Sequence, residues 1–286
     1  MTAHRLDTIL HAAGVYLSQR DVDSPRLSAE LLLAHAGRMR RLDVLVRPEA
    51  ELGESEAETF WELVRRRGEG EPVAYLVGHK EFYGRDFEVD PRVLIPRPET
   101  ELVVDLCKGI VPAQATWRVA DVCTGSGNLG VTLCCEFPGL QCVMGDISFT
   151  ALQVARRNAR RLGVAERSFA CRLGFASALK SGSLDLAVCN PPYIAPSEYD
   201  VLSREIVGYE PKIALLGGRE GLELPWRAVE SIASCLRPGG YLILETGREQ
   251  ARRVASHMVR TESVWSQVRV HLDLRGDERC VSAQRV

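Results

Sequence analysis

Apolar residues recur at helical spacing near the start of the chain. The residues that follow the i, i+3, i+4 pattern of an amphipathic helix are Leu6, Ile9, Leu10, Ala13 and Leu17. Ser24–Pro25 has the composition of a second helix start, and Ser55 with Glu58 fits a capping box. We therefore predict a small helical domain over residues 1–72.

The pattern changes to short alternating segments after residue 78. Residues 79–82 and 85–89 are typical of strands, and Tyr83–Gly84 between them is a turn signal. We predict a β-hairpin there, within a linker of residues 73–111. The linker continues into Pro96–Pro98, which should be extended because proline restricts its own φ and the residue before it.

Strands and helices alternate from residue 112 to the end. Strands are predicted near residues 118–122, 141–145, 168–172, 184–189 and 241–245. Residues 237–240 have the composition of a turn before the last of these. Residues 268–274 and 279–283 are typical of a terminal antiparallel hairpin. This order predicts an α/β fold, a doubly wound and mostly parallel seven-stranded sheet over residues 112–286.

Composition narrows the class of protein. The chain has 286 residues, a net charge of −2 and ordinary apolar and charged contents. It therefore lacks a global basic field for a nucleic-acid backbone. Clustered arginines, Arg65–Arg67 and Arg156–Arg161, are interpreted as solvated helix faces. We expect no direct nucleic-acid partner.

Cysteine and histidine usage indicates neither a disulfide framework nor a metal site. The nine cysteines include no Cys-x-x-Cys pair, and the six histidines are widely spaced. Residues 1–5 lack a signal-peptide hydrophobic region, and no apolar run reaches membrane-spanning length. We expect a cytoplasmic monomer with reduced thiols, no membrane contact and no metal.

The tetrapeptide Asn190-Pro191-Pro192-Tyr193 ends a buried apolar strand. Two successive prolines remove backbone donors and keep the segment extended. An amide side chain, a free carbonyl and an aromatic ring are thus placed where open α/β sheets bind ligands. Asn190 Oδ1 and the Pro191 carbonyl could accept both protons of a planar NH2 group, with Tyr193 as a wall. Taken alone, the tetrapeptide is equally typical of a structural turn.

A glycine-rich turn lies upstream of it. Residues 119–122 form an apolar strand, and Cys123-Thr124-Gly125-Ser126-Gly127 follows before a helix. Asp146 ends the next strand, about twenty residues after the glycines, which suits a ribose diol. Loop and acid together indicate a nucleoside-type cofactor without specifying which. A nicotinamide cofactor is disfavoured only by Asn190–Tyr193, and no Gly-Lys-Ser/Thr phosphate loop follows.

The glycine-rich turn, the acid Asp146 and the tetrapeptide Asn190–Tyr193, in this order, resemble the amino-methyltransferases that use S-adenosylmethionine. Three further stretches, residues 71–87, 94–101 and 209–222, resemble signatures of the release-factor glutamine methyltransferase family (HemK-like). The resemblance runs from Pro25 to Gly276, nearly the whole chain. It implies methyl transfer from S-adenosylmethionine to the side-chain amide of the glutamine in the Gly-Gly-Gln motif of class-1 peptide release factors.

The resemblance also implies roles for residues. Cys123, Thr124, Gly125, Ser126 and Gly127 then lie beside the methionine part of the cofactor. Asp146 binds the ribose, Phe175 packs on the adenine, and Asn190 adjoins both cofactor and substrate. Asn190, Pro191, Pro192 and Tyr193 bind the substrate amide, and Asn190, Pro191 and Tyr193 carry catalysis. Glu99, Thr100 and Glu101 also approach the cofactor.

Three positions depart from the family pattern, and they leave room for other functions. The family usually has Gly at Cys123, Asp at Gly174, and Asp or Phe at Leu216. A methyltransferase acting on a nucleic-acid base shares Asn-Pro-Pro-Tyr, but it usually needs a basic recognition region. A relative acting on a small amide or guanidino metabolite stays open, as does a cofactor-binding protein without catalysis. The last would require loss of the acceptors at Asn190–Tyr193, which are intact.

Overall fold

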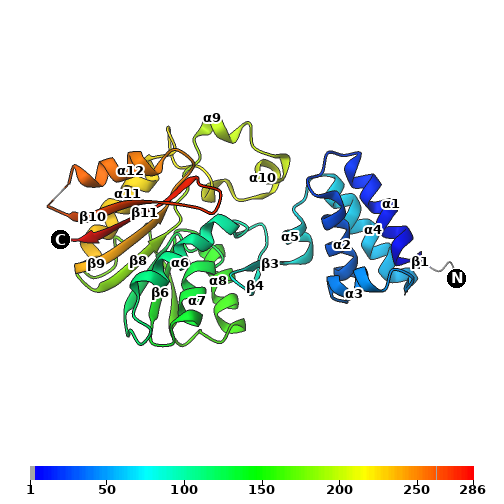
Figure 1. The fold of residues 1–286 in the computed structure, drawn as a ribbon, viewed down its shortest axis with the longest axis horizontal. Helices are drawn as coiled ribbons and strands as arrows, with labels where there is room; N and C mark the ends of the chain where they lie inside the picture. Colours follow the sequence, from blue (N-terminus) through cyan, green and yellow to red (C-terminus); the bar gives the residue numbers. More distant parts are fainter. Residues whose placement is uncertain (1–3, 262) are drawn as a thin grey trace. The chain divides into compact units, whose positions relative to one another are not determined.

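The computed structural model describes residues 4–261 and 263–286 and divides into two compact units (Figure 1). One unit comprises the chain up to His79 together with Ser203–Tyr209. The other comprises Lys80–Leu202 and Glu210–Val286. The helical domain was predicted to start at residue 1, and residues 1–3 lie outside the described residues.

The first unit is helical. Its elements are β1 (His4–Arg5), α1 (Leu6–Ser18), α2 (Pro25–Ala36), α3 (Arg41–Val46), β2 (Glu51–Leu52), α4 (Glu54–Gly68), α5 (Val73–Val77) and, from later in the chain, α10 (Arg204–Tyr209). The predicted stripe of α1 faces the core of this unit, where Leu6, Ala13 and Leu17 are buried. Arg67 of α4 was interpreted as part of a solvated helix face, but it is buried and forms an ion pair with Glu205 of α10.

The capping box predicted at Ser55 is wrong. Helix α4 begins at Glu54, and its N-cap is Gly53, which makes no side-chain cap bond. Ser55 therefore lies within the first turn, where its carbonyl accepts a hydrogen bond from the Thr59 hydroxyl. Carboxylates at Glu54 and Glu56 favour this earlier start, because negative charge stabilises a helix N-terminus.

The predicted hairpin precedes the sheet of the second unit. Strands β3 (His79–Phe82) and β4 (Arg85–Glu88) pair with each other, as expected from the turn at Tyr83–Gly84. The segment predicted to be extended remains so at Arg97, but Pro98 begins the 3-10 helix η1 (Pro98–Thr100), which leads into α6 (Glu101–Ile110). Phe82 and Phe87 bury their rings edge to face in the core of this unit.

The second unit contains the predicted mostly parallel sheet of seven strands. They are β5 (Arg118–Val122), β6 (Gln141–Asp146), β7 (Ser168–Arg172), β8 (Leu184–Cys189), β9 (Leu236–Glu245), β10 (Trp265–Leu272) and β11 (Glu278–Arg285). Their order in the sheet is β10-β11-β9-β8-β5-β6-β7. Strand β11 is antiparallel to both of its neighbours, and the β9-β8-β5-β6-β7 pairs are parallel.

Helices cover both faces of this sheet (Figure 1). The connecting helices are α7 (Asn128–Glu136), α8 (Phe149–Arg161), α9 (Pro196–Tyr199), η2 (Lys212–Ala214), α11 (Glu223–Cys235) and α12 (Ala251–Val259). Side chains of β8 alternate between two cores: Leu186 and Val188 pack with α6, α7 and α8, whereas Ala187 and Cys189 pack with α11 and α12. Burial on both faces explains why this strand has an almost unbroken apolar sequence.

The turn predicted at residues 237–240 lies inside β9 instead of before it. Leu184 pairs with Leu236 and Leu186 pairs with Tyr241, so the intervening residues bulge out of the ladder. Gly239 has a φ of 78° and permits this bulge. The irregularity therefore lies at the predicted residues, but β9 pairs with β8 on both sides of it, at Leu236 and again from Tyr241.

Candidate active site

The predicted chemistry gathers at one edge of the sheet. Strands β5 and β8 are neighbours, and the chain order reverses between them, which is where open α/β sheets bind ligands. A pocket of about 270 Å³ lies at their carboxyl ends. The sequence-predicted residues that line it are Cys123, Thr124, Gly125, Ser126, Asp146, Phe175, Asn190 and Pro192. Gly127, Pro191 and Tyr193 lie outside its lining.

The glycine-rich turn after β5 has an unusual backbone. Cys123, Gly125 and Gly127 have φ values of 62°, 54° and 82°. Gly127 is the N-cap of α7, and a Cβ there would lie 3.1 Å from the Cβ of Ala155. Cys123 thus occupies a left-handed conformation that costs an L-residue roughly 1–2 kcal/mol. This accounts for the glycine that the family usually has at this position.

Asp121 supports this turn from within the sheet, although the sequence pattern did not single it out. Its side chain is buried, and Oδ2 accepts the Thr124 hydroxyl at 2.5 Å and the Gly130 N–H at 2.8 Å. Burial raises the pKa of Asp121 to about 7. A charged residue inside an apolar strand was the available signal, because such residues are rarely buried without a specific partner.

Asp146 holds the same turn from the end of β6. Its Oδ2 accepts the Gly125 N–H at 2.9 Å and its Oδ1 accepts the Ser148 N–H at 2.8 Å. Burial raises its pKa, and hydrogen bonds to backbone N–H groups oppose the shift. Each carboxylate oxygen retains a lone pair, so the group can still accept both hydroxyls of a ribose.

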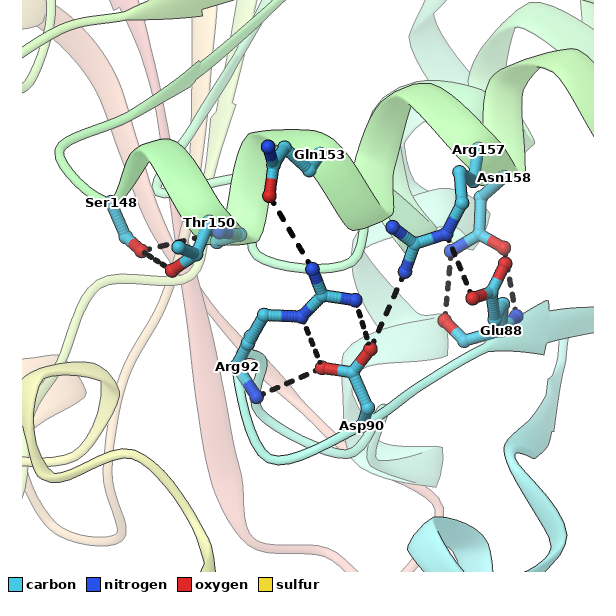
Figure 2. A network of polar contacts seen from close by, with 9 residues as sticks. Glu88, Asp90, Arg92, Ser148, Thr150, Gln153, Arg157 and Asn158 are labelled. Atoms are coloured by element: carbon cyan, nitrogen blue, oxygen red, sulfur yellow. Dashed lines mark hydrogen bonds and ion pairs between the residues drawn. The ribbon is translucent and has the colours of Figure 1, made fainter.

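A buried amide on α8 connects the turn to the strand β4. Asn158 Nδ2 donates to the carbonyl of Ser126 at 2.8 Å. It also donates to the Glu88 carbonyl at 2.9 Å, and Oδ1 accepts the Glu88 N–H at 2.7 Å (Figure 2). Arg157 pairs with the Glu88 carboxylate in the same network. Both polar atoms of the fully buried Asn158 side chain are therefore used in holding backbone.

The same network positions a charged side chain of the pocket. Asp90 binds Arg92 through Nε at 2.8 Å, and Arg92 Nη1 donates to Gln153 at 3.4 Å (Figure 2). Arg92 lines the pocket. Arg92, which follows β4, thus places a positively charged side chain at the pocket, and no sequence motif indicated it.

Apolar side chains form the far end of the pocket. Phe175, Leu173 and Ile147 line it, and the Ile147 side chain is about half exposed. The Arg227 guanidinium lies 5.7 Å from the centroid of the Phe175 ring. Gly174 also lines this end and carries no side chain that could bond a base. A planar aromatic group can therefore stack here with fewer polar contacts than the family pattern offers.

The Asn190–Tyr193 segment follows β8, and the side chains of Asn190 and Tyr193 bond to different partners. Asn190 Nδ2 donates to the Thr100 hydroxyl at 3.3 Å. The Tyr193 hydroxyl donates to Glu245 Oε1 at 3.3 Å, and the Tyr193 carbonyl accepts from Gln250 Nε2 at 2.8 Å. Tyr193 is thus directed toward the end of β9, while Asn190 remains in the pocket lining.

Glu210 joins two stretches that are distant in sequence. Its buried carboxylate accepts the Ile95 N–H at 3.1 Å and forms an ion pair with Arg97. Of the acids expected beside the pocket, Glu101 instead accepts the Tyr83 N–H at 2.8 Å, and Glu99 lies 3.7 Å from Arg275. From residues 99–101, only Thr100 lines the pocket.

The stretch after η2 packs on the Asn190–Tyr193 segment. Leu216 bridges to Ile194, and the Gly217 N–H donates to the Ile194 carbonyl at 3.0 Å. A Cβ at Gly217 would lie 2.6 Å from the Pro192 carbonyl oxygen. Glycine is therefore required for this close approach. The structure shows nothing that explains leucine in place of the usual residue at position 216.

Metal-binding side chains do not gather anywhere in the part of the chain that the structure describes. Within residues 4–261 and 263–286, no group of three or more His, Cys, Asp or Glu side chains could hold a metal ion. Over the same residues, no helix is long and apolar enough to cross a membrane. All nine cysteines are free thiols, and Cys171 is exposed.

The residues present fit a nucleoside cofactor. The Asp146 carboxylate faces the pocket, a glycine cradle adjoins it, and an apolar end can receive a base. The fold and this site together define an S-adenosylmethionine-dependent methyltransferase. A solved structure described as a methyltransferase from Pyrococcus furiosus shares the fold, with a TM-score of 0.54 and 16% identity over 77% of this chain and 96% of that chain.

Comparison with known proteins gives the family. Residues 8–78 match the PrmC N-terminal domain and residues 103–209 match the methyltransferase small domain. A release factor glutamine methyltransferase of Nitratidesulfovibrio vulgaris is 44% identical over 99% of this chain and 97% of its own length. One of Koribacter versatilis is 40% identical over 94% of this chain and 95% of its own. The chain belongs to the release factor glutamine methyltransferase family.

Proposed function

We propose that the protein transfers a methyl group from S-adenosylmethionine to the side-chain amide nitrogen (N5) of the glutamine in the Gly-Gly-Gln motif of class-1 release factors. Membership of the family supports the reaction. The observation that carries the proposal is the position of Asn190, which lines the same pocket as the glycine turn and Asp146. Among the described residues, none donates to Asn190 Oδ1, so this acceptor is available to a substrate.

The cofactor would be held by the elements already described. Asp146 would accept the ribose hydroxyls, Phe175 would stack on the adenine, and residues 123–127 would border the methionine part. When bound, S-adenosylmethionine supplies a methyl group activated by a sulfonium. The chain's own contribution is to position the two reactants, and positioning of this kind can account for much of a rate enhancement.

The substrate amide is a poor nucleophile, because its nitrogen lone pair is shared with the carbonyl. Asn190 Oδ1 and the Pro191 carbonyl would accept its two N–H groups. These bonds would orient the lone pair and stabilise positive charge as it develops on nitrogen. The proton can leave after alkylation, so no strong base is required beside Asn190.

The helical unit would select the protein that carries the glutamine. The pocket residues all belong to the second unit, so the first unit is free for another role. A hollow of about 500 Å³ lies on the first unit, bordered by Val15 of α1, Pro25 of α2 and Leu45 of α3. Val15 and Leu45 are 44% and 40% exposed. Exposed apolar side chains that gather in this way mark protein interaction surfaces.

The proposal extends to the state of the enzyme in the cell. We propose that it acts as a monomer in the cytoplasm, where release factors function. The nine free thiols agree with a reducing compartment. Elution as a stable dimer at assay concentration would contradict the first part of this statement.

The test is methylation with labelled S-adenosylmethionine of a release factor, DNA and free amino acids in parallel. We expect label on the release factor alone, and loss of it when the Gly-Gly-Gln glutamine is changed. Asn190→Ala should lower the rate by about 10²–10³, with cofactor affinity retained. Label on DNA or on free amino acids at equal efficiency would favour a nucleic-acid base or a small metabolite as the substrate.

A further inference from the structure

We propose that Arg227 of α11 binds the purine base of the cofactor by donating hydrogen bonds to its acceptor atoms, while Phe175 stacks on the face of the base. The inference rests on the proposed function, in which Phe175 receives the adenine, and it concerns how this chain selects the base. Its consequence is a site that recognises acceptors on the purine and does not depend on the 6-amino group.

Arg227 differs from the other arginines of the pocket in having no acidic partner. Of the described residues, three arginines line the pocket: Arg92, Arg97 and Arg227. The first two each form an ion pair with a carboxylate. No described residue forms a hydrogen bond or an ion pair with the Arg227 side chain. Because a guanidinium has five N–H donors, Arg227 brings unused donors to the site.

The apolar end of the pocket lacks side chains that could bond a base. Phe175, Leu173 and Ile147 carry no hydrogen-bonding side-chain atom, and Gly174 has no side chain. The Arg227 guanidinium lies 5.7 Å from the centroid of the Phe175 ring, close to the outer limit of about 6 Å for a cation–π attraction. This contact is therefore weak, and the guanidinium can turn toward a base that stacks on the ring.

The loop that carries Phe175 is fastened to the helix that carries Arg227. The Ala176 N–H donates to Ser231 Oγ at 3.1 Å, and Cys235 Sγ donates to the Ala176 carbonyl at 3.2 Å. Ser231 lies one turn after Arg227 on α11. Phe175 itself has a φ of 55°, a strained conformation that persists only where the surrounding structure fixes it. The ring and the guanidinium are thus presented to the pocket from one support.

The chemistry of the guanidinium determines which atoms of the base it can bind. Adenine offers ring-nitrogen acceptors, among them N3 and N7, and a donor group at N6. A guanidinium has no acceptor, so Arg227 can bond the ring nitrogens but not the 6-amino group. A purine with oxygen at position 6 keeps N3 and N7 and gains a further acceptor. This chain should therefore bind a 6-oxo purine nucleoside about as well as the adenine nucleoside.

The test measures binding to the full-length enzyme by calorimetry, with S-adenosylhomocysteine and its 6-oxo analogue, in which hypoxanthine replaces adenine. In the parent, the two dissociation constants should agree within about threefold. Arg227→Met removes the donors and should raise both constants about tenfold. Because Arg227 is exposed, this variant should keep the fold.

Arg160→Met is the matched control. Arg160 is exposed on α8 in the same unit, does not line the pocket, and forms no hydrogen bond or ion pair with a described residue. Its replacement removes the same charge from the surface of the protein. Both dissociation constants of Arg160→Met should equal those of the parent.

Gly174→Asp tests the position of the base with an acceptor in place of a donor. A Cβ at Gly174 would have no atom within 4 Å, so the side chain should be accommodated. The new carboxylate would accept from the 6-amino group of adenine and would repel a 6-oxygen. The ratio of the two dissociation constants should therefore shift about tenfold in favour of adenine.

Three outcomes would overturn the inference. They are a parent that prefers adenine by more than about threefold, parent-like constants in Arg227→Met, and a parent-like ratio in Gly174→Asp. All three are binding constants and do not depend on which molecule accepts the methyl group. Label on DNA or on free amino acids instead of the release factor would refute the proposed function and leave these constants unchanged, so the two failures are distinguishable.

Discussion

Asp146 accepts the backbone N–H of Gly125 at 2.9 Å, and this bond joins the end of β6 to the glycine turn after β5. The carboxylate thereby fixes the turn and faces the pocket at the same time. The structural and the binding role of one side chain are thus coupled. Replacing it tests both.

Asp146→Ala should weaken S-adenosylmethionine binding far more than it slows turnover at saturation. Loss of a charged acceptor for the ribose costs roughly 1.5–3 kcal/mol of binding free energy. Asp146→Asn keeps an acceptor for the Gly125 N–H but loses the charge, so its affinity should fall between those of Asp146→Ala and the parent. Calorimetry checks the order, and an unchanged dissociation constant in Asp146→Ala would remove the residue from the site.

The buried Asp121 should make stability depend on pH. Its pKa rises from 3.8 to about 7 on folding, because burial penalises the charged form. The folded state therefore holds this proton more tightly than the unfolded state. The contribution to the free energy of unfolding is largest below about pH 4 and is lost as pH rises toward about 7.

Asp121→Asn removes this titration while keeping an acceptor for Thr124 and Gly130. The thermal midpoint of the parent should fall relative to that of the variant between about pH 4 and pH 7, by an amount that corresponds to a few kcal/mol, since each pKa unit is about 1.4 kcal/mol. Differential scanning calorimetry at matched ionic strength measures the difference. Parallel midpoint curves for the two proteins would show that Asp121 does not titrate in this range.

Gly217→Ala should disturb the Asn190–Tyr193 segment. The new Cβ would lie 2.6 Å from the Pro192 and Gly221 carbonyl oxygens and from the Tyr193 Cα, all of them backbone atoms that cannot rotate away. We expect a loss of roughly 1–3 kcal/mol in the free energy of unfolding, together with a large loss of methylation rate.

Gly109→Ala is the matched control for this substitution. Gly109 lies in α6 with no atom within 4 Å of the added Cβ, and alanine favours a helix interior. This variant should be at least as stable as the parent. If Gly217→Ala behaved in the same way in urea unfolding, the close approach would not constrain the segment.

The sequence was most informative where one pattern extends over a whole element. The apolar run of β8 and the strand at residues 118–122 were predicted because burial on a sheet imposes a pattern that the chain itself displays. Parallel strands end at one edge, so the glycine turn, Asp146 and Asn190 could be expected to meet there. The pocket lining contains all three.

Other parts of the site depend on pairings that the local sequence does not display. Asn158 bonds to Ser126 across 32 residues and to Glu88 across 70, and nothing near Asn158 in sequence indicates either partner. The direction of Tyr193 is set by Glu245, which adjoins it only through the register of β9 on β8. The start of α4 at Glu54 was missed because glycine and serine are both acceptable caps.

The last prediction concerns recognition of the protein substrate by the helical unit. Val15→Glu or Leu45→Glu should raise the KM for an intact release factor about tenfold, because each places a charge on the apolar hollow of α1, α2 and α3. Both side chains are already 44% and 40% exposed, so the fold should lose little stability. Methylation of a short Gly-Gly-Gln peptide should be unchanged, since the peptide reaches only the pocket of the second unit.

Val259→Glu provides the control for added surface charge. Val259 ends α12 in the second unit and is 49% exposed, so it matches the two test positions in exposure and in the charge introduced. Its KM values for protein and peptide should both equal those of the parent. The ratio of the two KM values therefore isolates the contribution of the helical unit. A ratio unchanged by Val15→Glu and Leu45→Glu would place release-factor selection elsewhere on the molecule.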